Sequence, residues 1–419
     1  MRRAVLAVAL VVMVLIPLPV LASDTPPQPP QCAARDCRTQ PASEELWAVP
    51  LTGTWPDGTW SAGTGPGTTG DGGTVPASGQ TASVAVGDGF AVVGTGLSLT
   101  GYDSATGGRR WQTTLTAAAG AEIVAVRAWP GVITVGLLAP GGHARTEVVL
   151  DAATGRELRH YPAAVFGGTV TASAATTVVI GRATVTSYDN ATGRPRWQRS
   201  TSGGQSWQAD GGTLYVAQAP GGYLSSSPVT ALKVIDLKTG AERVLSSPLD
   251  SPFSGTLAMA VDRVVLFASS TGVTAYSGST GDLLWSRSGW VPEGTDPGAP
   301  AADFTVADGT LIAADPLTAA VRASAPASVA AGTAALYVVR NGVALGLNSG
   351  SNGTAWGYDM TKGEVTWTSP TLPWPHFFSD VAGLGGSAAA AGGLVVVTAC
   401  QHLASAGICA DPELVAFRL

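Results

Sequence analysis

A ten-residue pattern that returns along the chain limits its fold more than any other feature. The segment "YDSATGGRRW" begins at Tyr102, and "YDNATGRPRW" begins at Tyr188. Successive copies of the pattern are 48, 38, 47, 41, 38 and 44 residues apart. Units of about 40 to 45 residues made of short apolar strands are typical of β-propeller blades. The acidic or serine positions of the copies are Asp103, Asp151, Asp189, Asp236, Ser277, Asp315 and Asp359.

The pattern predicts a hairpin turn followed by a strand. Asp103 can accept hydrogen bonds from backbone N–H groups of the turn, and Gly107 can adopt a positive φ. Trp111 falls in the next strand, where its ring favours burial and its N–H group needs an acceptor. We therefore assign the repeat a structural role. Its residues are Trp47, Asp103, Gly107, Trp111, Asp151, Gly155, Asp189, Gly193, Trp197, Asp236, Gly240, Gly281, Trp285, Asp359, Gly363 and Trp367.

Short apolar segments before each turn bring every unit to four strands. They are "ASVAV", "FAVVG" and "SLTGYD" in the first unit, and "ASVAAG", "ALYVVR" and "TAWGYD" in the seventh. The chain ends on "LVAFRL" without a fourth strand, whereas "EELWAVPL" (44–51) stands alone near the start. We predict an all-β, eight-bladed propeller of four-stranded antiparallel blades, closed by the N-terminal strand in the C-terminal blade. Seven blades are the alternative, because the sixth unit is short.

Repeats of the form x-D-x-x-T-G-x-x-x-W resemble those of pyrroloquinoline-quinone-like propellers. This family includes the quinoprotein dehydrogenases and a non-catalytic outer-membrane-assembly lipoprotein, both eight-bladed, and the chain is closest in kind to the second. The resemblance covers nearly the whole chain after its N-terminal segment. It implies that Trp111, Trp197, Trp285 and Trp367 dock between neighbouring blades, and it says little about function.

The resemblance also indicates what an enzyme of this family would need. Its quinoproteins use adjacent cysteines, a calcium ion and a catalytic aspartate. This chain has no adjacent cysteines, and nothing fixes Glu293, Asp380 and Asp411 as calcium ligands. We expect no catalytic residue, metal site or cofactor, with pyrroloquinoline quinone and calcium as the unsupported alternative. The four histidines are scattered: His143, His160, His376 and His402.

The N-terminus reads "MRRAVLAVALVVMVLIPLPVLASD", with two arginines before an apolar run that ends in small residues. This pattern predicts a secretory signal peptide over residues 1–22, with an uncleaved membrane anchor as the alternative. A Pro-rich linker over 23–43 precedes the propeller, which we place at 44–419. We therefore expect a secreted or cell-surface protein. Export permits disulfides, and the simplest pairing is Cys32–Cys37 and Cys400–Cys409.

The charge of the chain excludes one class of partner. The formal net charge is −6, and 12% of the residues are charged. The sequence contains no block of consecutive basic residues. Nucleic-acid binding requires a basic surface, so we expect no nucleic-acid partner. Contact with a membrane is expected only through an uncleaved N-terminal segment.

Long connections should gather at one face of the predicted propeller. Second-to-third and blade-to-blade connections lie opposite the repeat turns, and the long segments fall among them: 52–80, 219–228, 288–300, 341–352, 370–386 and 401–412. Their aromatic side chains either cap the blades or form an exposed patch for a protein or glycan partner. We expect a monomeric binding or scaffold module, with a quinoprotein dehydrogenase or an extracellular sensor as alternatives. The candidate binding residues are Trp55, Trp60, Trp290, Trp374, His376, Phe377, Phe378 and His402.

Overall fold

A computed structural model of the chain describes residues 45–51 and 83–418, apart from short gaps. All the described strands belong to eight four-stranded antiparallel sheets. The gaps are residues 88, 141–143, 164–166, 182, 202–203, 220–227, 247–252, 254, 297–300, 307–308, 326–332, 341–342, 349–354, 369–387, 392–393 and 401–411.

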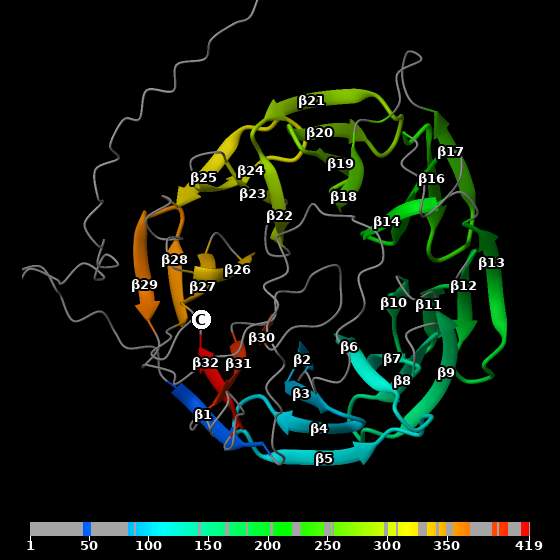
Figure 1. Ribbon diagram of the computed structural model, residues 1–419, viewed down its shortest axis with the longest axis vertical. Coiled ribbons are helices and arrows are strands. Elements are labelled where there is room, and N and C mark those ends of the chain that lie inside the picture. The colour runs from blue at the N-terminus through cyan, green and yellow to red at the C-terminus, as the bar shows by residue number, and fades with distance from the viewer. Residues whose placement is uncertain are drawn as a thin grey trace, which may run out of the picture. The chain divides into compact units, whose positions relative to one another are not determined.

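The strands of each sheet follow one another in the sequence, except in the eighth (Figure 1). The first sheet holds β2 (Ser83–Gly87), β3 (Phe90–Thr95), β4 (Ser98–Asp103) and β5 (Arg109–Thr114). The second holds β6 (Glu122–Trp129), β7 (Val132–Leu138), β8 (Arg145–Asp151) and β9 (Glu157–Ala163). The third holds β10 (Gly168–Ala172), β11 (Thr176–Ile180), β12 (Thr184–Asp189) and β13 (Pro195–Ser200). The fourth holds β14 (Gly204–Asp210), β15 (Thr213–Gln218), β16 (Ala231–Asp236) and β17 (Glu242–Ser246).

The second half of the chain repeats this arrangement. The fifth sheet holds β18 (Thr256–Val261), β19 (Val264–Ser269), β20 (Gly272–Ser277) and β21 (Leu283–Ser288). The sixth holds β22 (Val291–Asp296), β23 (Ala301–Thr305), β24 (Leu311–Ala314) and β25 (Val321–Ala325). The seventh holds β26 (Thr333–Arg340), β27 (Val343–Asn348), β28 (Ala355–Asp359) and β29 (Glu364–Thr368). The eighth joins β30 (Ala388–Ala391), β31 (Leu394–Cys400) and β32 (Pro412–Arg418) to β1 (Glu45–Pro50).

The core lies between consecutive sheets. Every residue of β7 is buried, which is the pattern of a strand covered on both faces. One apolar cluster joins Val92 and Leu99 of the first sheet to Ile133 of the second. Another joins Leu266 of the fifth sheet to Phe304 of the sixth. We call each contact between consecutive sheets a seam.

The two ends of the described chain meet in the eighth sheet. β1 pairs antiparallel with β32, with Ala48 opposite Val415. Trp47 is 7% exposed and shares an apolar cluster with Val84 of the first sheet and Ala416 of β32. The all-β class, the four-stranded units and the pairing of the N-terminal strand with the C-terminal sheet are therefore confirmed.

Two segments expected to be long connections contain strands instead. Segment 288–300 contains β22, the strand that the short sixth unit lacked in the sequence. Segment 341–352 contains β27, and the first strand of the seventh sheet is β26. The segment "ASVAAG", expected as that first strand, lies outside the described residues. Both strands were missed because "VPEGTD" and "VALGLN" contain Pro, Gly, Asp or Asn, which are depleted in strands.

The N-terminal predictions lie outside the described residues. They are the signal peptide or anchor at 1–22, the linker at 23–43 and the Cys32–Cys37 pair. In the described part of the chain, no helix is long and apolar enough to span a membrane.

Candidate functional site

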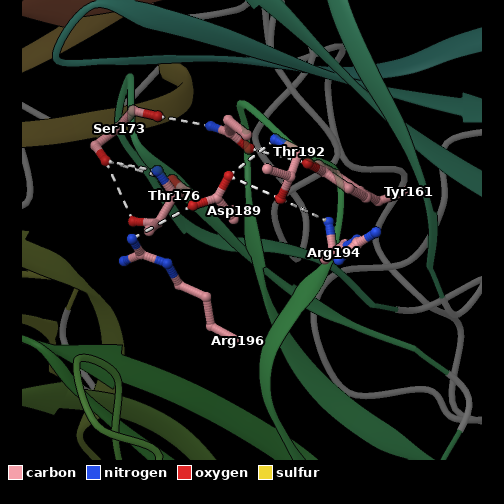
Figure 2. Close-up of polar contacts among 8 residues, drawn as sticks. Tyr161, Ser173, Thr176, Asp189, Thr192, Arg194 and Arg196 are labelled. Atoms are coloured by element: carbon pink, nitrogen blue, oxygen red, sulfur yellow. Dashed lines mark hydrogen bonds and ion pairs between the residues drawn. The ribbon is translucent and has the colours of Figure 1, made fainter.

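The aspartate of each repeat closes its own turn. In the third sheet, Asp189 Oδ1 accepts hydrogen bonds from the backbone N–H of Thr192 at 2.9 Å and from its hydroxyl at 3.0 Å (Figure 2). The Thr192 hydroxyl oxygen accepts the N–H of Arg194 at 3.3 Å. The backbone carbonyl of Asp189 accepts the N–H of Gly193 at 2.7 Å. Equivalent carboxylate-to-backbone bonds occur at Asp103, Asp151, Asp236, Asp315 and Asp359.

These turns keep their carboxylates ionised. A hydrogen bond from the Arg110 guanidinium, assisted by the Thr106 hydroxyl, lowers the pKa of Asp103 to about 2. A hydrogen bond from the backbone N–H of Thr192 likewise lowers the pKa of Asp189. Hydrogen bonds to the charged form of an acid favour that form. Since each carboxylate is bound within its own turn, the local structure of the turn accounts for the lowered pKa values.

The repeat tryptophans link each turn to the preceding sheet. The Trp111 indole N–H donates to the carbonyl of Ala152, in the turn of the second sheet, at 3.1 Å. Trp47 of β1 donates in the same way to Ser104 of the first sheet, at 2.9 Å. The family resemblance implied docking between blades for Trp111, Trp197, Trp285 and Trp367. Trp285 of the fifth sheet makes the equivalent bond to the carbonyl of Pro316, at 2.8 Å.

In two of these turns a glycine lies directly under the tryptophan ring. Gly155 has a φ of 69°, and a Cβ there would lie 2.3 Å from Cε3 of Trp111. A Cβ on Gly107 would lie 2.8 Å from the ring of Trp47. At Gly107 and Gly155, glycine therefore suits both the positive φ and the ring that packs on it. Gly193, Gly240, Gly281 and Gly363 also have positive φ values, and Ala319 takes this position in the sixth sheet with a φ of 57°.

The seam between the second and third sheets uses arginine in place of tryptophan. Arg159 stands eight residues after Asp151, where other units have tryptophan. Its Nη2 donates to the carbonyl of Ala191 in the next turn at 2.6 Å. Its Nε would lie 3.2 Å from a Cβ on Gly193, so the guanidinium packs where a ring packs elsewhere.

A second arginine links the fourth sheet to the fifth. Val244 occupies the tryptophan position and is 55% exposed. The preceding Arg243 instead donates to the carbonyls of Gly278 at 3.0 Å and Ser279 at 2.5 Å. Gly278 holds the same turn position as Ala152, so the guanidinium reaches the carbonyl that an indole reaches elsewhere. Sequence reasoning missed both arginines because it searched only for aromatic residues at this position.

The seam between the third and fourth sheets differs again. The Trp197 ring packs on Gly240, where a Cβ would lie 2.7 Å from it. Its indole N–H is buried and has no hydrogen-bond partner among the described residues. Arg199 supplies the cross-seam bond instead, from Nε to the carbonyl of Gly240 at 2.5 Å. Trp367 lies in β29, and its side chain is not among those described.

Of the candidate binding residues, the structure describes Trp290. Trp290 is half-buried, with its ring centroid 4.9 Å from Phe304 and 6.0 Å from Trp285, so it packs against the core of the fifth and sixth sheets. Cys400 lies in β31, without a described side chain. The others lie outside the described residues: Trp55, Trp60, Trp374, His376, Phe377, Phe378, His402 and Cys409.

The long connections nevertheless share one topological position. β1 ends at Pro50 and β2 begins at Ser83, while β29 ends at Thr368 and β30 begins at Ala388. The connections from β15 to β16 and from β31 to β32 are also long. In an antiparallel sheet that runs in sequence order, all four leave from the end opposite the repeat turn. We call this the long-connection end of the sheets.

No cluster of metal-ligating side chains was found in the described residues, where groups of three or more His, Cys, Asp or Glu were sought. His160 contacts Glu157 at 3.0 Å on an exposed part of β9.

Together these features define the class of protein: a β-propeller of repeated four-stranded sheets, whose turns receive a side chain from the sheet before. The chain belongs to the family described as outer membrane protein assembly factor BamB, which matches it over residues 59–199, 144–297 and 181–345. The overlapping matches reflect the internal repeat. The resemblance stated from the sequence is therefore confirmed. No curated protein matches the chain.

Solved structures resemble the chain at low sequence identity. The computationally designed Ika8 protein is 17% identical, with 81% of this chain and 97% of that chain covered and a TM-score of 0.51. BamB from Moraxella catarrhalis is 20% identical, with 68% and 83% covered and a TM-score of 0.40. Quinohemoprotein alcohol dehydrogenase from Comamonas testosteroni is 15% identical, with 81% and 74% covered and a TM-score of 0.48. The similarity to the designed protein concerns the fold alone.

Proposed function

We propose that the chain is an exported, non-catalytic binding or scaffold module built on a ring of eight blades. Two observations support the ring. β2 contacts both β6 of the second sheet and β30 of the eighth, and β18 contacts both β14 and β22, so first strands of neighbouring sheets adjoin. The eighth sheet is shared by both ends of the described chain, which leaves no blade with a missing strand.

The functional proposal rests on the observation that the polar groups of the repeat are already bound within the fold. The Asp103 carboxylate accepts from Ala105 and Thr106 and pairs with Arg110, all within one hairpin. The Trp111 N–H group is used across the seam. The repeat is thus accounted for by folding, and a function specific to this chain belongs to the residues that do not repeat.

We propose that those residues lie at the long-connection end of the sheets and bind a protein or glycan. Aromatic residues and Pro are concentrated there in the sequence, as in "LPWPHFF" around Trp374. Aromatic residues are enriched in interfaces because they bury a large area at low cost in conformational entropy. Membership of a family described as an outer membrane protein assembly factor supports a protein partner and an extracytoplasmic location. A Cys400–Cys409 disulfide would stiffen one of these connections, and the monomer is the proposed unit.

A paired experiment tests this function. The wild-type protein is first used to capture a partner from its native cells. The double variant Trp374→Ala/Phe377→Ala should bind that partner at least about tenfold more weakly, as expected when interface aromatics are truncated. Its thermal midpoint should stay near that of the wild type. Arg194→Ala, at the repeat-turn end, is the control and should bind normally. Undiminished capture by the double variant, or a large fall in its thermal midpoint, would contradict the proposal.

A further inference from the structure

A cationic side chain and an exposed apolar one lie side by side in the chain where the fifth sheet passes into the sixth. Gly289 and Trp290 join β21 to β22, at the end of β21 opposite its repeat turn. The backbone N–H of Gly289 donates to the carbonyl of Thr271, in the turn between β19 and β20, at 2.9 Å. Arg287, Trp290 and Val291 therefore belong to a described part of the long-connection end.

The ring of Trp290 already has neighbours against it and over it. Its centroid lies 4.9 Å from that of Phe304 and 6.0 Å from that of Trp285, so the core holds the ring in place. The guanidinium carbon of Arg287 lies over the ring, 6.0 Å from its centroid, as in a cation–π contact. A sugar would have to displace this guanidinium to stack on that side of the ring. The contacts therefore favour a ligand that binds the guanidinium itself.

The charge of Arg287 is not neutralised within the described part of the chain. The side chain is exposed, and besides its contact with Trp290 it donates to the carbonyl of Ser286 at 3.2 Å. No described carboxylate pairs with it. Arg110 and Arg196, by contrast, pair with the aspartates of their own hairpins. Arg287 is thus available for a charge-assisted hydrogen bond to a carboxylate of another molecule.

An exposed valine follows the tryptophan. Val291, the first residue of β22, is 46% exposed. Val84 and Leu257, which lie in the first strands of two other sheets, are 3% and 2% exposed. A single exposed apolar residue is ordinary on a protein surface, but this one lies in the same segment as a cation without a carboxylate partner. Apolar and arginine side chains together are typical of protein interfaces.

We propose that Arg287 and Val291 bind a protein segment that carries an acidic residue close to an apolar one. A carboxylate of the segment pairs with Arg287, and the apolar side chain covers Val291. Trp290 positions the guanidinium from below and keeps its own place in the core. This inference rests on the proposed function and narrows the partner from a protein or glycan to an acidic and apolar protein segment.

A titration with defined peptides tests the site in the full chain. The tryptophans are labelled with ¹⁵N, and the indole resonance of Trp290 is assigned by its loss in Trp290→Phe. An eight-residue peptide of leucine and glutamate should shift this resonance. A matched peptide with glutamine in place of glutamate should bind about threefold to fivefold more weakly, which is the range of an exposed ion pair. A peptide with serine in place of leucine should also bind more weakly, because Val291 then loses its apolar cover.

Substitutions at the site separate the two contacts. Arg287→Gln should abolish the preference for glutamate over glutamine, Arg287→Lys should retain it, and Val291→Ser should abolish the preference for leucine over serine. Arg196→Gln, an exposed arginine at the repeat-turn end, is the control and should behave as the wild type does. A preference for glutamate that survives Arg287→Gln would overturn the proposal. So would the absence of binding by every peptide, or a shift caused by maltohexaose alone.

The two proposals fail in different ways. If Trp374→Ala/Phe377→Ala loses the captured partner while the peptides fail to bind at Trp290, this inference alone is overturned. Undiminished capture by that double variant contradicts the proposed function, whatever the peptides do.

Discussion

The ring of Trp111 occupies the space that a side chain on Gly155 would need, 2.3 Å from the ring atom Cε3 to the position of a Cβ. The two residues lie in neighbouring sheets, 44 positions apart in the sequence. The indole also donates to the carbonyl of Ala152 in the same turn. One sheet therefore supplies the ring and the next supplies the glycine that admits it. Through this contact the repeat joins one sheet to the next.

Replacement of Gly155 by alanine should be far more harmful than the same change at Gly211. Both glycines have positive φ values, 69° and 51°, so each substitution carries backbone strain of about 1 kcal/mol. Only Gly155→Ala also forces a Cβ into a tryptophan ring, which adds about 1–3 kcal/mol. Nothing lies within 4 Å of a Cβ on Gly211. Urea unfolding of both variants measures the difference, and equal losses would show that the ring contact does not matter.

Removal of Arg243 should weaken the seam between the fourth and fifth sheets. Arg243→Ala deletes the bonds to the carbonyls of Gly278 and Ser279 and should cost about 1–2 kcal/mol in free energy of unfolding. Arg194→Ala removes an exposed arginine whose side chain is not needed for a seam, and it should change stability by less than about 0.5 kcal/mol. Urea titration compares the two. A neutral Arg243→Ala would show that this arginine does not replace the missing tryptophan.

The turn aspartates should make the fold sensitive to acid. The folded pKa of Asp103 is about 2, below its usual 3.8, so its charge stabilises the fold above the higher value. That contribution is lost as the pH falls from about 4 towards 2. Asp103→Asn keeps the Oδ1 acceptor without the charge, so the stability gap between wild type and variant should be largest at pH 5 and should narrow towards pH 2. Urea unfolding across this range is the measurement, and a gap that does not change with pH would contradict the role of the charge.

The N-terminal strand should be essential for the eighth sheet. Trp47→Ala removes a buried ring that packs on Gly107 and donates to Ser104, and should cost about 3–5 kcal/mol. Trp290→Ala removes a half-buried ring of the same size and should cost less. Thermal and urea unfolding decide between them. If Trp47→Ala were the milder change, β1 would not be an integral strand of the fold.

The repeat allowed the sheets to be counted from the sequence, because the turn chemistry is local and its spacing is regular. The pairing of β1 with β32 was predicted because the segment "EELWAVPL" belongs to no repeat unit, while the C-terminal unit lacks its fourth strand. β22 and β27 could not be predicted in this way. Their Pro, Gly and Asn residues disfavour strands, and pairing with neighbouring strands stabilises them instead. The arginine at position 243 was missed for a related reason: its role depends on which carbonyl lies across the seam.

Photo-crosslinking from both ends of the sheets tests the central claim, that a partner binds where the repeat does not reach. A photoreactive residue is placed at Phe377, in a long connection, or at Thr106, in a repeat turn, and the protein is irradiated in its native cells. The account predicts one dominant crosslinked product from position 377 and none from position 106. Crosslinks from position 106 alone, or none from position 377 in a folded protein, would contradict it.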